Sequence, residues 1–199
     1  MKYFLRFFFL LFLTAMLSGC FGAQQLQTRM MATARPDGVC RMAVLPFDNW
    51  TNEEQAGVVA QRIFYGALVN SGAFEVRPEG DVSLFRLRHR LAPGALLGKF
   101  HFTDLQEKLQ IDAIVQGRLT EVGSISGRGA DEVPVVAMQL QVYDVRRGEL
   151  LLSTFHHRWG DDYRKVMHFG TVTTLTGLFD RMSDEIIADW IERGLGNCQ

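Results

Sequence analysis

Apolar residues from position 41 onward follow two patterns, which predict strands and helices in alternation. Short apolar runs that end at a proline or a turn predict buried strands at 41–47, 74–76 and 111–119. Between the first two runs, apolar residues at helical spacing predict a helix from Ala56 to a stop at 70–72. A strand, a helix and a second strand in this order form a β-α-β unit, so the two strands are expected to be parallel.

Polar segments of this first half predict the connections between these elements. Residues 48–50 predict a turn, and Thr51 and Glu54 are spaced as a capping box for the helix that follows. Two further short helices are expected at 81–89 and 103–110, because capping residues precede each of them. These segments are expected to link the strands and to cover them.

The second half contains a two-residue alternation of apolar and polar positions. Residues 135–145 alternate in this way, and 149–159 continue after a turn, so the two segments predict an antiparallel hairpin. The glycine-rich segment 123–130 is expected to be a loop, and 175–190 predict a closing helix that ends near Gly194. The pattern as a whole predicts a single α/β domain, with a mixed parallel and antiparallel sheet of about five strands packed with helices.

The first twenty residues have the three-part layout of a secretory signal. Lys2 and Arg6 supply positive charge, an apolar run follows at 7–16, and a stretch of mostly small residues ends at Cys20. The apolar run is shorter than the roughly 20 residues that a membrane-spanning helix needs. An ordinary signal peptide with a chance cysteine, or an uncleaved anchor, are the simpler interpretations.

The tetrapeptide Leu17-Ser18-Gly19-Cys20 resembles the bacterial lipobox. The resemblance implies a signal peptide at 1–19, cleavage after the glycine, and acyl chains on Cys20. These chains would hold the protein on a membrane without a spanning helix. The polar segment 20–38 then predicts a flexible tether, and 39–199 a periplasmic domain. Phe21 follows Cys20 where lipoproteins kept in the inner membrane commonly resemble one another in having aspartate, so the outer membrane is favoured.

Two cysteines remain in the expected domain, Cys40 and Cys198. In an oxidising compartment they form a candidate disulfide that would join the two ends of the domain. Two free thiols are the alternative.

Four segments behind the lipobox resemble, in their order, a group of envelope lipoproteins. The segments are MAVLPFDN at 42–49, SGAFEV at 71–76, IDAIVQGRLT at 111–120 and VYDV at 142–145. They are similar to the curli-assembly (CsgG-like) family, to activators of penicillin-binding proteins and to the amino-terminal domain of TolB. The resemblance implies a non-catalytic binding or scaffold domain in an envelope assembly or secretion system. Its expected partners are other envelope proteins, with a homo-oligomer possible.

Two alternatives to a scaffold remain open. The curli family also suggests a subunit of an oligomeric outer-membrane pore. Residues 135–145 are the one candidate for a strand inserted in the membrane. We interpret this strand as part of the sheet, because spanning strands need about 9–11 alternating residues and aromatic belts. The other alternative is a hydrolase or ligand-binding protein that uses the cleft of the sheet.

Composition and motifs argue against several kinds of chemistry. The formal net charge of -1 argues against a nucleic-acid binder. No spacing predicts a metal site or a cofactor, and in the segment 123–127 Ile125 occupies the central position where a nucleophile elbow needs serine. His156 and His157 are neighbours on an expected strand, so their side chains should point to opposite faces. The sequence therefore predicts no catalytic residues.

One basic cluster stands out on this slightly acidic chain. It predicts a contact with lipid headgroups, anionic glycans or an acidic partner. A solvated helix face is the alternative. The cluster consists of Arg77, Arg86, Arg88 and Arg90, with His89 among them.

Overall fold

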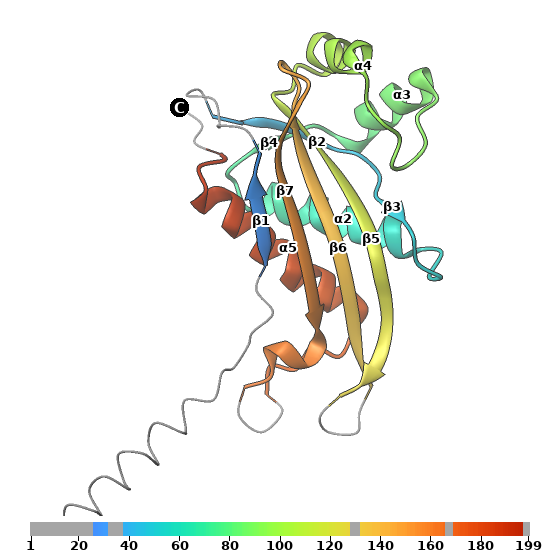
Figure 1. The fold of residues 1–199 in the computed structure, drawn as a ribbon, viewed down its shortest axis with the longest axis vertical. Helices are drawn as coiled ribbons and strands as arrows, with labels where there is room; N and C mark the ends of the chain where they lie inside the picture. Colours follow the sequence, from blue (N-terminus) through green and yellow to red (C-terminus); the bar gives the residue numbers. More distant parts are fainter. Residues whose placement is uncertain (1–25, 32–37, 128–131, 166–168, 197–199) are drawn as a thin grey trace, which may run out of the picture.

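A long, twisted sheet organises the molecule in the computed structural model, which describes residues 26–31, 38–127, 132–165 and 169–196 (Figure 1). In these ranges seven strands pair in the order β1-β7-β6-β5-β2-β4, and β3 pairs with β5. The strands are β1 (Gln27–Met30), β2 (Arg41–Val44), β3 (Asp48–Asn49), β4 (Glu75–Val76), β5 (Ala113–Ser126), β6 (Glu132–Asp144) and β7 (Glu149–Trp159).

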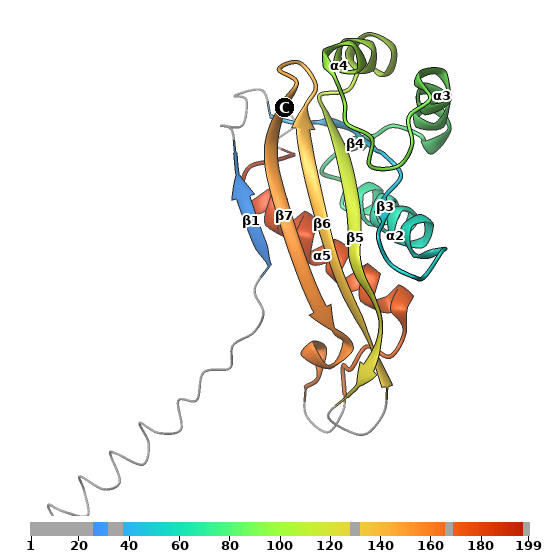
Figure 2. The ribbon, with the colours of Figure 1, turned by 45° about the vertical axis from the view of Figure 1, so that its right-hand side comes forward.

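Helices cover the sheet unequally. Helices α2 (Ala56–Asn70) and α5 (Leu175–Glu192) lie along one face, whereas α3 (Glu79–His89), α4 (Lys99–Asp104) and the π-helix η1 (Leu105–Leu109) gather at one end (Figures 1 and 2). A short 3-10 helix, η2 (Gly160–Tyr163), follows β7. Of the helices in the described ranges, none combines the length and the apolar character needed to cross a membrane.

The predicted architecture is confirmed. The fold is α/β with a mixed sheet: β2 and β4 are parallel and α2 connects them, whereas β6 is antiparallel to both β5 and β7. Strand β6 therefore lies inside the sheet, as we interpreted it. Helix α5 buries the apolar face that its periodicity predicts, including Phe179, Met182 and Trp190. The sheet has more strands than the expected five because two very short ones join it.

The buried side chains form two clusters on opposite faces of the sheet. Strand β2 alternates between them: Met42 and Val44 belong to the larger cluster, with α2 and α5, and Ala43 belongs to the smaller one, beneath α3, α4 and η1. Strand β5 begins in the same way, with Ala113 in the larger cluster and Ile114 in the smaller. This end of the sheet is thus buried on both faces.

Residues 48–50 do not form the predicted turn. Asp48 and Asn49 form β3, which is parallel to β5, and the Asp48 carboxylate accepts a hydrogen bond of 3.1 Å from Arg118 Nε. Phe47 and β3 can lie close to β5 because β5 has a glycine, Gly117, beneath the Phe47 ring. A Cβ at this position would approach Phe47 Cδ1 to 2.4 Å. Strand β3 thus gives hydrogen-bond partners to backbone groups of β5 that lie beyond the end of β2.

The capping box at Thr51 and Glu54 is wrong. Helix α2 begins only at Ala56, and its N-cap Gln55 makes no side-chain capping bond. The Thr51 hydroxyl instead donates to Asn49 Oδ1 at 2.8 Å, so it stabilises the turn that leaves β3.

Two other boundaries also differ from the expectation. Residues 123–126, expected in a loop, extend β5 and pair with 132–135 of β6, because a continuing partner strand compensates for the weak strand preference of glycine; residues 128–131 lie outside the described ranges. The helix expected at 103–110 begins earlier, at Lys99 of α4, and changes to a π-helix at Leu105.

Strand β1 falls within the segment predicted as a flexible tether. It pairs antiparallel with β7, Thr28 and Thr154 share a hydroxyl hydrogen bond of 2.8 Å, and Leu26 packs against the larger cluster. Without β1, β7 would present an open edge, which folded proteins avoid. Residues 26–31 therefore belong to the domain.

Asp112, at the beginning of β5, holds the start of the neighbouring strand β2. Its carboxylate accepts hydrogen bonds from the backbone N–H of Arg41 at 2.9 Å and of Cys40 at 3.3 Å. It also accepts one from the Arg41 guanidinium at 3.3 Å. Burial alone would raise the pKa of Asp112, but these bonds and the charge of Arg41 hold it below the ordinary value. Cys40 is disulfide-bonded. Cys198 lies outside the described ranges, so its pairing with Cys40 stays a prediction.

We expect Asp112→Asn to lower the free energy of unfolding at pH 7 by about 1–3 kcal/mol, because buried donors lose a charged acceptor. A carboxyl whose pKa is lowered by folding stabilises above its unfolded pKa, and this stability is lost as pH falls through the folded pKa. The difference between wild type and variant should therefore shrink below about pH 4. Urea denaturation at pH 7 and pH 3 measures it, with the exposed Asp180→Asn as control. An equal difference at both values would contradict the role of the charge.

Candidate anion-binding pocket

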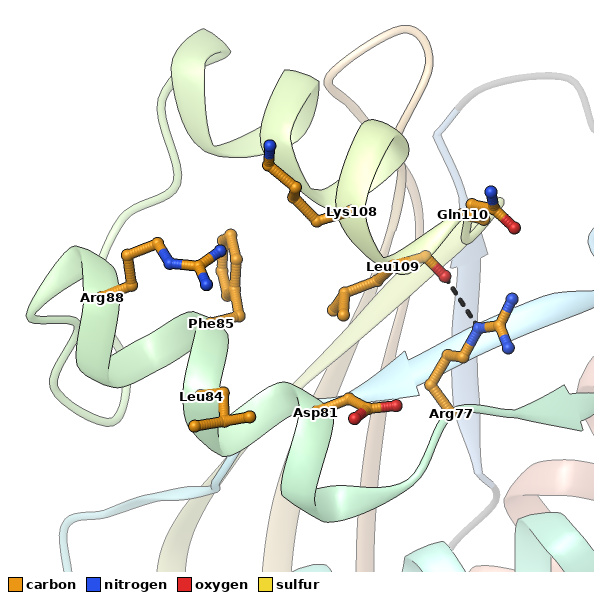
Figure 3. Close-up of a pocket in the computed structure, with 8 residues that line it drawn as sticks. All are labelled: Arg77, Asp81, Leu84, Phe85, Arg88, Lys108, Leu109 and Gln110. Atoms are coloured by element: carbon orange, nitrogen blue, oxygen red, sulfur yellow. Dashed lines mark hydrogen bonds between the residues drawn. The ribbon is translucent and has the colours of Figure 1, made fainter.

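A cavity beside the basic cluster lies between α3 and η1. Its volume is about 490 Å³. Helix α3 forms one wall, and the end of η1 forms the other (Figure 3). It is lined by Arg77, Asp81, Leu84, Phe85, Arg88, Lys108, Leu109 and Gln110.

Helix α3 presents one continuous face to the pocket. It follows Pro78, which suits a helix start, and Asp81 lies in its first turn, where a negative charge is favourable. Its lining residues lie at positions i, i+3, i+4 and i+7, which share one side of an α-helix. Phe85 is buried and joins the pocket floor to the smaller hydrophobic cluster. The four residues are Asp81, Leu84, Phe85 and Arg88.

The opposite wall is an irregular piece of backbone. Leu105–Leu109 form a π-helix, a rare arrangement that is frequent at functional sites. Gln110 then adopts a left-handed conformation with φ of 51°, which is uncommon for a residue with a side chain. Together they turn the chain sharply into β5, so that Lys108, Leu109 and Gln110 face α3 across the pocket.

A hydrogen bond between two side chains holds the walls together beside the pocket. His89 Nε2, at the end of α3, lies 2.7 Å from Asp104 Oδ2, at the end of α4, and both side chains are mostly buried. The His89 ring also packs on Phe85, with ring centroids 4.5 Å apart, and on Phe100 at 5.5 Å. This contact fixes α3 against the segment that carries Lys108.

The charges of the pocket are predominantly positive. Arg77 is fixed, since its Nε donates to the Leu109 carbonyl at 2.7 Å and its Nη1 lies 3.3 Å from Glu75. Arg88 and Lys108 make no ion pair with any residue in the described ranges. Asp81 is the one acidic side chain in the lining. The pocket thus carries an excess of positive charge beside an apolar floor.

The structure divides the predicted basic cluster. Arg77 and Arg88 line the pocket, but Arg86, two positions from Arg88, lies on another side of α3 and donates to the Leu91 carbonyl at 3.3 Å. Arg90 ends the helix with a φ of 53° and is exposed outside the pocket. Only part of the cluster can therefore bind one ligand.

Sequence reasoning missed half of this pocket. Lys108 and Gln110 come from a segment about twenty residues after Arg88, and no local pattern links the two. The spacing of Asp81, Leu84, Phe85 and Arg88 was available in the sequence and would have separated Arg88 from Arg86. The predicted lipidation residue, Cys20, lies outside the described residues.

The adjacent histidines lie on opposite faces of β7, as their spacing predicts. His156 is fully buried, 2.5 Å from Glu185 Oε2, which also accepts from Arg158 Nε at 3.2 Å. Burial opposes ionisation of Glu185, but His156 and Arg158 hold its pKa below the usual value. His157 lies on the other face, 3.3 Å from Glu121. Across the described residues, no group of His, Cys, Asp and Glu side chains could hold a metal ion.

Comparison with known proteins gives a shared fold. A scan against family models finds no match, nor does a search of curated proteins. A solved PelC dodecamer from Paraburkholderia phytofirmans is 18% identical, aligns over 82% of this chain and 96% of its own, and has a TM-score of 0.53. Hypothetical protein CT253 from Chlamydia trachomatis is 14% identical over 79% and 98%, with a TM-score of 0.52. The chain therefore shares its fold with both.

A third structure lies just below that level of similarity. Lipoprotein GNA1162 from Neisseria meningitidis is 17% identical over 77% of this chain and 99% of its own, with a TM-score of 0.49.

We expect Gln110→Gly to raise the free energy of unfolding by about 0.5–1 kcal/mol, because glycine adopts positive φ without the steric cost of a Cβ. Chemical denaturation measures the change. Gln106→Gly is the matched control, since Gln106 is an exposed helical residue in η1, where glycine should cost about 1 kcal/mol. A loss of stability in Gln110→Gly would mean that the Gln110 side chain makes contacts worth more than the strain.

Proposed function

We propose that this chain is a non-catalytic, lipid-anchored binding or scaffold protein of the bacterial cell envelope. Cys20 attaches it to the outer membrane, its domain faces the periplasm, and it acts in an assembly or secretion system with other envelope proteins. The lipobox-like sequence supports the anchor. The shared fold of a protein that forms a dodecamer supports a role in assembly.

The position of β1 determines how closely the proposed anchor would hold the domain. Leu26 already packs on the core, so only about five residues separate Cys20 from the domain. Extended at about 3.4 Å per residue they reach roughly 17 Å. Strand β1 begins opposite Phe155, and β7 continues to Trp159, about 13 Å farther in the direction from which the chain enters. A lipid on Cys20 would therefore hold the Trp159 end of the sheet next to the membrane.

We expect Cys20→Ala to abolish labelling by a radioactive or alkyne fatty acid and to release the protein from membranes, since the lipobox-like sequence then lacks its cysteine. Membrane fractionation and metabolic labelling measure the two effects. Phe21→Asp is the companion variant: it should keep the label but move the protein from the outer to the inner membrane, because aspartate after the lipidated cysteine resembles lipoproteins kept in the inner membrane. Retention of Cys20→Ala in the membrane fraction would contradict the anchor.

A second candidate property is self-assembly through the uncovered face of the sheet. No helix lies over the front of β6 and β7 below α4 within the described ranges (Figures 1 and 2). Phe155 and Trp159 are each 42% exposed on that face, and His157 packs edge-on against Trp159. Exposed aromatic side chains on a rigid sheet are typical centres of protein interfaces. We propose a second copy of this chain as the partner of this face.

We expect the full-length protein in neutral detergent to have the mass of several copies by light scattering, and Phe155→Arg to shift it to a monomer, because a charge would be buried in the interface. Phe100→Arg is the control: Phe100 is 70% exposed on α4, away from this face, and its replacement should leave the mass unchanged. A wild-type monomer at micromolar concentration would contradict self-assembly through this face.

A further inference from the structure

The pocket between α3 and η1 combines charge and apolar surface in a definite order. Phe85 and Leu109 lie between Arg88 on one side and Arg77 and Gln110 on the other, and the Lys108 side chain lies above them and extends toward the Arg88 side (Figure 3). The middle of the pocket is therefore apolar, and cationic groups stand at its two ends. A ligand that fits this order has an anionic group joined to a compact apolar part.

The volume agrees with a small molecule. Pockets for small ligands commonly enclose about 300–1,000 Å³ and combine apolar walls with a few polar groups. This cavity of about 490 Å³ falls within that range. A folded protein partner would need a far larger contact area, of about 800 Å² on each side.

The charges indicate the sign of the ligand. Arg77, Arg88 and Lys108 outnumber Asp81 in the lining, and Arg88 and Lys108 have no ion-pair partner in the part of the chain that the structure describes. Guanidinium groups suit phosphate and carboxylate because they donate two parallel hydrogen bonds. Asp81 and Gln110 can accept hydrogen bonds from a hydroxyl group of the same ligand.

The walls are held in place before any ligand binds. The His89–Asp104 pair joins α3 to α4, and Arg77 is anchored on the Leu109 carbonyl. The π-helix and the left-handed Gln110 give the second wall a backbone that costs free energy, and such strain is concentrated at functional sites. A site built in this way loses less entropy on binding.

We propose that this pocket binds a small organic anion, in which one phosphate or carboxylate group is joined to an apolar ring or chain. The anion lies between Arg88 and Lys108, and the apolar part lies on Phe85 and Leu109. This site adds to the proposed membrane attachment and does not depend on it.

Calorimetric titration of the full-length protein in neutral detergent with phenyl phosphate tests the proposal. Phenyl phosphate should bind more tightly than either inorganic phosphate or phenol, because each of these lacks one half of the expected contacts. Arg88→Gln and Lys108→Gln should each weaken binding by about tenfold, the loss expected for one charged hydrogen bond. Binding should also weaken with added salt.

Arg90→Gln is the matched control, since Arg90 belongs to the same basic cluster but lies outside the pocket. It should bind like wild type, and all variants should unfold at the same temperature because the three side chains are exposed. Benzoate provides a second arm: tighter binding of benzoate assigns the site to carboxylates such as acidic sugars, and tighter binding of phenyl phosphate assigns it to phosphates. No heat with either compound, or equal losses in all three variants, would overturn the proposal.

Discussion

Burial of one end of the sheet on both faces is the constraint on which the rest of this structure depends. Strand β2 and the beginning of β5 send alternate side chains into two separate clusters, so both faces there need a cover. Helices α2 and α5 supply the first cover. The second must come from the chain between β4 and β5, which therefore folds into α3, α4 and η1. The pocket lies between two pieces of this second cover, and its floor is the smaller cluster.

The other end of the sheet follows a different rule. There β5, β6 and β7 are covered on one face only, as is common for antiparallel strands. Polar contacts help to fix that cover: Trp190 Nε1 donates to Thr154 Oγ1 at 2.8 Å, and Thr154 in turn contacts Thr28 of β1. One series of contacts thus runs from α5 through β7 to the edge strand. The opposite face keeps polar and aromatic side chains in solvent and is free to meet a partner.

The main elements could be predicted from the sequence because each is long enough for its spacing of apolar residues to repeat several times. Helices α2 and α5 and the β6–β7 hairpin repeat their pattern over ten or more residues. Strands β1 and β3 have four and two residues, too few for a period, and they exist because β7 and β5 offer open backbone groups. The pocket was predicted in part for the same reason. Local charge indicated Arg77 and Arg88, but Lys108 reaches them only through the tertiary fold.

The two ends of the sheet also separate the two proposed activities in space. Residue 26 enters the core at the level of His156, on the side of Trp159, whereas the pocket lies beyond the other end of β5, next to Gln110. Under the proposed attachment the membrane lies at the Trp159 end, so the pocket opens away from the bilayer that holds the anchor. In this orientation Arg88 and Lys108 do not face the headgroups of that same bilayer. The geometry therefore favours a ligand that arrives from the periplasmic side, either free or carried on another envelope component.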